Sequence, residues 1–85
     1  MRVTKHEHAA LTIEEHGKQL IVDPGAFTLP LLELDNVVAV VLTHEHPDHW
    51  TPEHLTRIRS AAPDAPIYGP EGVASAAAGF DITTV

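Results

Sequence analysis

Four residues whose side chains bind metal ions lie within six positions of the sequence: His44, His46, Asp48 and His49. They follow a run of branched apolar residues, so they stand where a buried strand is expected to end. His44 and His46 are two residues apart, and on an extended backbone such residues point to the same side, where both imidazoles can reach one cation. Asp48 and His49 are adjacent and would diverge on a strand, so a turn favoured by Pro47 must direct them toward a second cation.

This arrangement of nitrogen and oxygen ligands suits a dinuclear metal site. In such sites the two ions lie about 3.5–4 Å apart and hold a water between them, whose pKa falls far below that of bulk water, towards about 7. The product is a nucleophilic hydroxide at neutral pH, which predicts hydrolytic chemistry. A solvated, histidine-rich loop that binds metal only incidentally is the alternative interpretation of the same residues.

The position of the cluster in the chain also favours a catalytic role. Catalytic groups of α/β sheets gather beyond the carboxyl ends of the strands. Directly after the cluster, Thr51, Pro52 and Glu53 are typical of an N-cap, a first helical position and an acidic first turn. The positive end of that helix would point toward the cluster and would favour an anionic substrate or a bound hydroxide.

The elements that must position the cluster follow from the pattern of apolar residues. Residues 9–15 alternate between apolar and polar side chains, which predicts a half-buried strand. The His-Gly pair at 16–17 predicts a hairpin turn, and residues 19–23 return as a strand that ends in an Asp-Pro-Gly turn. Residues 37–43 form a continuous β-branched run, which predicts a central strand buried on both faces.

The second half of the chain predicts two helices between strands. The expected elements are a helix from Thr51 to about Ala62 that Pro63 stops, a strand at 66–69, a helix from Pro70 to Gly79, and a strand at 80–85. Residues 26–36 are compatible with a loop or with a short helix. The chain is therefore predicted to be one α/β unit, in which a hairpin is followed by β-α-β-α-β with right-handed crossovers.

Composition excludes several classes of function. The formal net charge is −7 and only five residues are Lys or Arg, which argues against a nucleic-acid surface. The chain has no cysteine, so any metal must be held by His, Asp or Glu. The first residues lack the apolar stretch of a signal peptide, and no run approaches 18 apolar residues. We therefore expect a cytoplasmic protein that acts on a small molecule, without membrane or nucleic-acid partners.

The segment "THEHPDH" (43–49) resembles the metal-binding signature of the metallo-β-lactamase superfamily. The segment "GKQLIVDPG" (17–25) is similar to the second strand of that superfamily, which ends in an aspartate. Residues 1–17 resemble the opening hairpin of a branch of small metal-dependent hydrolases that includes lactonase-like members. The resemblance covers all 85 residues, which correspond to the first third or half of a family domain. It implies that residues 1–85 are the N-terminal part of an αββα sandwich.

The resemblance also implies roles for individual residues. His44 and His46 would bind a first metal ion; Asp48 and His49 would bind a second, and Asp48 would also orient the attacking water. Asp23 would brace the ligand loop, although a simple turn residue is the other interpretation. Two divalent ions are implied; imidazole-rich ligation favours zinc, and manganese or iron also suits His and carboxylate ligands.

The sequence departs from the family pattern after the signature. The family uses a later histidine for the first metal, a bridging carboxylate, and another histidine for the second metal, whereas no histidine follows His54 here. Four of the seven expected ligands are present, so the isolated chain is expected to be weakly active or inactive.

The remaining histidines have weaker assignments. His8 occupies the place where this branch often has a histidine at the mouth of the active site, and a solvent-facing or hydrogen-bonded strand residue is the alternative. His6 is expected to have no role in the site, His16 is predicted to be a turn residue, and His54 is predicted to face solvent. Trp50 could line a pocket or could be a core or lid residue.

Two functions remain open at this stage. The first is a metal-dependent hydrolase that attacks an ester, lactone, amide, thioester or phosphoester. The second is a non-catalytic half-domain that binds metal weakly or not at all and self-associates through an uncovered sheet face.

Overall fold

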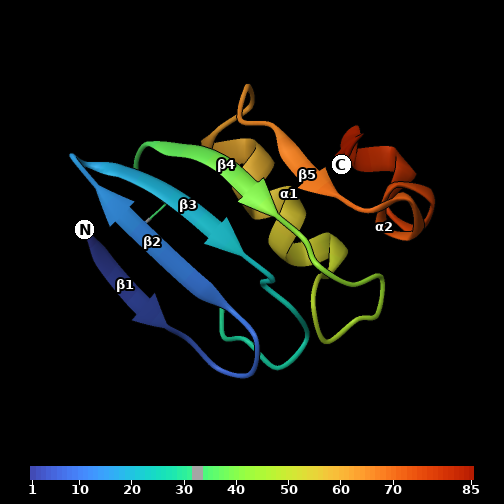
Figure 1. Ribbon diagram of the computed structural model, residues 1–85, viewed down its shortest axis with the longest axis horizontal. Coiled ribbons are helices and arrows are strands. Elements are labelled where there is room, and N and C mark those ends of the chain that lie inside the picture. Colours follow the sequence, from blue (N-terminus) through green and yellow to red (C-terminus); the bar gives the residue numbers. More distant parts are fainter. Residues whose placement is uncertain (32–33) are drawn as a thin grey trace.

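A six-stranded sheet with the strands in sequential order, β1 to β6, forms the framework of the protein (Figure 1). It is seen in a computed structural model that describes residues 1–31 and 34–85. The strands are β1 (Arg2–Lys5), β2 (Leu11–Glu15), β3 (Lys18–Val22), β4 (Val37–Val41), β5 (Ile67–Gly69) and β6 (Ile82–Thr84). The helices are α1 (Pro52–Ala61), α2 (Glu71–Ala76) and the 3₁₀ helix η1 (Ala78–Phe80).

The N-terminal half of the sheet is antiparallel. β2 and β3 form the predicted hairpin, with Glu15 opposite Lys18. The two turn residues have positive φ, 52° at His16 and 76° at Gly17, as expected of the turn that matches the natural twist of a hairpin. β1 pairs with β2 and is a strand that the alternation of apolar residues had not predicted.

The C-terminal half of the sheet is parallel, and it confirms the predicted alternation of strands and helices. β3, β4, β5 and β6 pair in parallel, with α1 between β4 and β5 and α2 between β5 and β6. α1 begins as expected, because the Thr51 side chain accepts a hydrogen bond from the backbone N–H of His54 at 3.1 Å. Its C-cap is Ala62, immediately before Pro63.

Several boundaries differ from the prediction. β2 begins at Leu11 instead of residue 9, and β4 ends at Val41 instead of residue 43. α2 ends at Ala76, and Gly79 lies inside η1 instead of ending α2. β6 starts only at Ile82, because Asp81 adopts a left-handed conformation with φ of 57° between η1 and the strand. In the 26–36 segment, no helix is present among residues 26–31 and 34–36; residues 32–33 lie outside the described residues.

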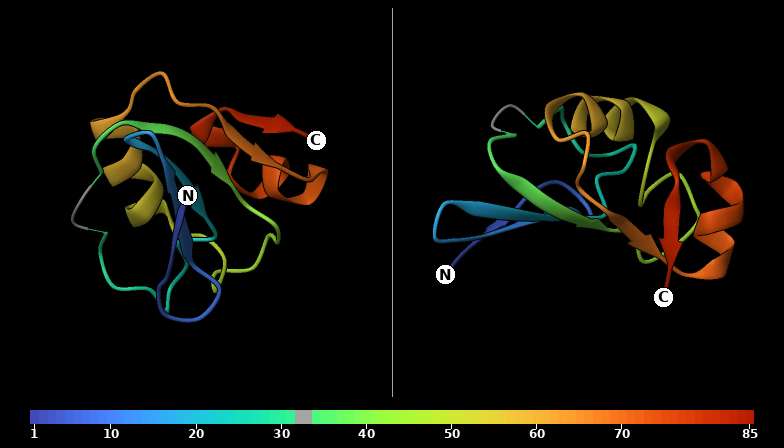
Figure 2. Two further views of the ribbon diagram at one scale, coloured as in Figure 1. Left: turned by 60° about the vertical axis from the view of Figure 1, so that its left-hand side comes forward. Right: turned by 90° about the horizontal axis from the view of Figure 1, so that it is seen from above.

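The hydrophobic core lies on one side of the sheet, beneath α1 (Figure 2). Leu55 and Ile58 of α1 are almost fully buried, together with Ile21 of β3 and Val40 of β4. Burial of such side chains contributes about 1.5–3 kcal/mol each relative to leaving them exposed. This packing fixes the start of α1 against the ends of β3 and β4, where the histidine cluster lies.

The opposite side of β1–β4 carries no described helix (Figure 2). Ile13 and Leu20 pair there and are only half-buried. The prediction that residues 37–43 are buried on both faces is therefore wrong. A register shift between β3 and β4 leaves Val38 without a pairing partner, and its side chain is 46% exposed.

Within residues 1–31 and 34–85, every helix is too short or too polar to span a lipid bilayer.

Candidate metal centre

The cluster occupies the loop that joins β4 to α1, and it lies beside the end of β3 (Figure 1). β3 and β4 are parallel neighbours, so their carboxyl ends meet at one edge of the sheet. The last bond of this pair is donated by the N–H of Asp23 to the carbonyl of Val41, at 3.1 Å. Residues 43–49 therefore begin directly beside Asp23, although 20 or more positions separate them in the chain.

Asp23 is buried and holds the loop through both of its carboxylate oxygens. Oδ1 accepts the backbone N–H of Thr43 at 2.7 Å, and Oδ2 accepts the Thr43 hydroxyl and Nδ1 of His49, the latter at 2.9 Å. Its φ of 48° turns the chain sharply at the end of β3. The sequence assigned Asp23 either a bracing role or a turn role, and in the structure this one residue does both.

These bonds fix the tautomer of two imidazoles. An ionised carboxylate only accepts hydrogen bonds, so Nδ1 of His49 must carry the proton that it donates to Asp23. The Thr43 hydroxyl also donates to Asp23, which leaves its oxygen free to accept from Nδ1 of His44 at 2.8 Å. Both histidines in their neutral form therefore present an unprotonated Nε2, which is the form that binds metal.

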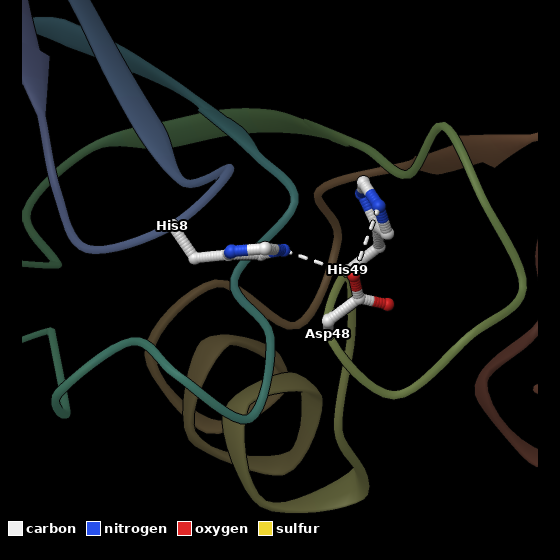
Figure 3. A group of neighbouring side chains, drawn as sticks. All are labelled: His8, Asp48 and His49. Carbon is white, nitrogen blue, oxygen red and sulfur yellow. Dashed lines mark hydrogen bonds and ion pairs between the residues drawn. The ribbon is translucent and has the colours of Figure 1, made fainter.

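Asp48 stands opposite His49 and contacts a histidine from another part of the sheet. Its Oδ2 lies 3.5 Å from Nε2 of His49 and 2.9 Å from Nε2 of His8, which belongs to the connection between β1 and β2 (Figure 3). The hydrogen bond from His8 lowers the pKa of Asp48 below its ordinary value. Asp48 is thus ionised and can accept bonds or bind a cation at neutral pH.

Gly25 permits the end of β3 to lie against the loop. A Cβ at this position would come within 2.0 Å of the carbonyl oxygen of Asp48 and 2.6 Å of the backbone nitrogen of His49. The adjacent N–H of Ala26 donates to the carbonyl of Pro47 at 2.8 Å. The Asp-Pro-Gly turn was predicted from its turn chemistry, but its glycine is required for this close backbone approach.

Among the described residues, two groups have three possible ligand atoms within 4.8 Å of one another. One is His8, Asp48 and His49; the other is Asp23, His44 and His49. These nitrogen and oxygen donors suit a borderline divalent cation. The oxygens of Asp23 already accept three hydrogen bonds. In the second group Asp23 therefore orients His49 directly and His44 through Thr43, and these two histidines remain available as metal ligands. The residues present therefore fit a metal ion.

His46 is the one member of the predicted ligand set that neither group includes. Its side chain is exposed, and its backbone carbonyl accepts the N–H of His49 at 3.0 Å, closing the turn around Pro47. Its assignment to the first metal stays a prediction from the sequence.

Two further histidines lie away from the cluster. His6 bonds through Nε2 to the Thr12 hydroxyl at 2.7 Å and lines a separate cavity of about 290 Å³. His54 was predicted to face solvent, and this is wrong: it is 7% exposed and its Nε2 lies 3.0 Å from the carbonyl of Thr28. The sequence did contain a pattern that predicts the burial of His54, because positions 54 and 58 are one helical turn apart and Ile58 is a core residue.

Trp50 packs against the hydrophobic core and donates its indole N–H to the carbonyl of Glu45 at 2.8 Å. Of the roles left open for it, the structure gives it that of a half-buried core residue that holds the loop.

The chain is similar to one segment of several longer proteins. The sequence model of one family, described as a beta-lactamase superfamily domain, matches residues 2–85. The protein Rv0786c of Mycobacterium tuberculosis is 31% identical over 68 residues, which cover 80% of this chain and 32% of that protein. A UPF0173 metal-dependent hydrolase of Anoxybacillus flavithermus is 38% identical over 53 residues, and one of Ligilactobacillus salivarius is 40% identical over 53 residues; each match covers 58% of this chain and 24% of the hydrolase.

The matched segment thus spans about a quarter to a third of the length of these relatives. No solved structure matches the chain.

Proposed function

This chain belongs to the beta-lactamase superfamily, and from that premise we propose that it is the ligand-loop portion of a metal-dependent hydrolase. Its substrates would be small molecules with an ester, lactone, amide, thioester or phosphoester bond. The names of the UPF0173 relatives support metal-dependent hydrolysis as the type of reaction.

The observation that carries the proposal is the pair of imidazoles whose tautomers are fixed by Asp23 and Thr43. In its neutral form each ring presents an unprotonated Nε2, and the two rings lie 4.3 Å apart between centroids. A histidine held by a carboxylate on its other nitrogen is the usual arrangement around protein metal ions. Hydrogen bonds that fix both tautomers in this way support a dedicated metal site over a loop that binds metal only incidentally.

The proposed ligands follow from this arrangement. Asp48 and His49 would hold one cation; His44, together with His46 as predicted from the sequence, would hold the other. Zinc suits these ligands best, and manganese or iron also suits them. When bound, such ions supply Lewis-acid activation of water and of the carbonyl or phosphoryl group to be cleaved.

The protein's own residues prepare the site for that chemistry. Asp23 and Thr43 keep the protons of His44 and His49 on Nδ1, away from the ligand side. Asp48, ionised at neutral pH, would orient the attacking water by accepting a hydrogen bond from it.

We expect zinc to stabilise the protein against heat, because a ligand that binds only the folded state shifts the unfolding equilibrium. At a free concentration one hundred times its dissociation constant, the gain is about 2.7 kcal/mol. Calorimetry with zinc, with EDTA and with no addition measures this gain. The same samples are assayed for hydrolysis of a panel of ester, lactone, thioester and phosphodiester substrates.

His16→Asn is the matched control, since it changes a histidine in the β2–β3 turn, far along the sheet, to a residue that tolerates positive φ. It should retain the full zinc effect. Unfolding temperatures that zinc leaves unchanged, or hydrolysis that persists in EDTA, would refute the proposed function.

A second candidate function is favoured by the uncovered side of the sheet, namely self-association of two copies of this chain. Val3 and Val38 are exposed there, beside half-buried apolar residues of β2 and β3. Lys18 and Glu15 lie at the rim of the same face and carry opposite charges. In a two-fold arrangement these charges could pair between the copies.

Sedimentation velocity tests this candidate. The wild-type chain is expected to dimerise, and Val38→Lys should weaken the dimer at least tenfold by burying a charge in the interface. Leu29→Lys, at an exposed site on the other side of the sheet, should leave the dimer unchanged. A monomer at every concentration would eliminate this candidate and would leave the hydrolase proposal untouched.

A further inference from the structure

His8 reaches the candidate metal centre from the β1–β2 connection, which lies at the same end of the sheet as the end of β3. Its Nε2 contacts Oδ2 of Asp48 at 2.9 Å, and its ring meets the ring of His49 edge-on with centroids 5.9 Å apart (Figure 3). One ligand atom from each of these three residues lies within 4.8 Å of the other two.

The connection that carries His8 is held in place by several bonds. The backbone of His8 has a φ of 58°. The carbonyl of Glu7 accepts a hydrogen bond from the Thr28 hydroxyl at 3.1 Å. The Glu7 carboxylate accepts the N–H of Leu29, also at 3.1 Å. The ring of Phe27 packs against the imidazole with centroids 5.2 Å apart. His8 is therefore directed at Asp48 by the fold and does not sample the surface freely.

We propose that His8 is the third protein ligand of the divalent cation held by Asp48 and His49. This inference rests on the proposed function, since it adds a ligand to one of its two cations. Catalytic zinc sites usually have three protein ligands, whereas the signature loop supplies only Asp48 and His49 to this cation. Of the described residues outside the loop, His8 is the one whose imidazole joins these two donors.

The competing role for His8 is that of a positioning residue, which would only donate its Nε2–H to Asp48. The two roles can be separated by His8→Gln. A glutamine amide nitrogen lies at the distance of Nε2 from the backbone, so this variant can keep the hydrogen bond to Asp48 but binds zinc poorly. His8→Ala removes both interactions. Because the His8 side chain is 42% exposed, neither change should prevent folding.

Zinc affinity of the full 85-residue chain is measured by isothermal titration calorimetry for the wild type, His8→Gln, His8→Ala and His6→Gln. His6→Gln is the matched control, because it lies in the same connection and contacts Thr12 instead of the metal centre. We expect His8→Gln and His8→Ala each to weaken one zinc site at least tenfold, and His6→Gln to leave both sites unchanged.

A direct readout accompanies the affinities. In long-range ¹H–¹⁵N NMR spectra of the imidazoles, zinc should shift the Nε2 resonance that is missing from His8→Gln. A His8→Gln variant with wild-type affinity, or a His8 resonance that zinc does not move, would overturn the proposal and leave the rest of the site intact. If the wild type binds no zinc at all, the proposed function itself fails.

Discussion

Replacing His49 with asparagine should strongly weaken the proposed zinc site of Asp48 and His49 while leaving the protein folded. An asparagine amide nitrogen lies where Nδ1 of the histidine lies, so it can still donate to the buried carboxylate of Asp23. What it lacks is the Nε2 that faces Asp48. We expect zinc affinity to fall about a hundredfold or more. Removing a residue that only hydrogen-bonds a metal ligand already lowers metal affinity by about ten- to a hundredfold.

Isothermal titration with zinc and a thermal unfolding curve without metal test this prediction together. His49→Ala serves as the comparison, since it removes both contacts and should also lower metal-free stability by about 1–3 kcal/mol, as expected when a buried partner loses its bond. If His49→Asn bound zinc like the wild type, His49 would not be a ligand, and both proposed ligand groups would have to be revised.

Among the glycines whose φ is negative, Gly25 is the one at which substitution by alanine should destabilise the protein most. The added carbon would lie 2.0 Å from the carbonyl oxygen of Asp48, which is backbone and cannot rotate away. The turn after β3 and the loop after β4 would have to separate. Overpacking of this kind costs about 1–3 kcal/mol and occasionally more, and for a chain of this size about 3 kcal/mol lowers Tm by more than about 10 °C.

Gly79→Ala is the matched control, because a Cβ at Gly79 meets no atom within 4 Å. Its unfolding temperature should stay close to that of the wild type. Gly25→Ala should also weaken zinc binding, since Asp23 would no longer lie beside Thr43 and His49. Equal unfolding temperatures for the two variants would show that the two loops can separate without cost and that their contact does not organise the site.

Much of the framework could be predicted from local patterns. The His-Gly turn, the Thr-Pro start of α1 and the β-branched run of β4 each depend on residues close in sequence, and each was confirmed. The apolar pattern did not predict β1, because Arg2–Lys5 is largely exposed and has no alternation that marks a buried face. The exposure of Val38 depends on a register shift between two strands, which no local pattern reveals.

The site was predictable in its chemistry and less so in its contacts. The spacing from His44 to His49 indicated a metal centre, and the position of Asp23 suggested a brace. The need for Gly25 and the reach of His8 to Asp48 both arise from segments that are distant in sequence and meet only in three dimensions.

The bonds of Asp23 have a thermodynamic consequence. They join the end of one strand to a loop 20 to 26 residues later, so the nitrogens proposed to bind metal are already oriented before any cation arrives. The tertiary structure thus preorganises the ligand atoms, as the rigid framework of a chelating agent does. The conformational entropy needed to bring these atoms together is lost when the chain folds and not when the ion binds. Such a chelator should release its ion in the same cooperative transition in which the chain unfolds, and bind it again only after the sheet has reformed.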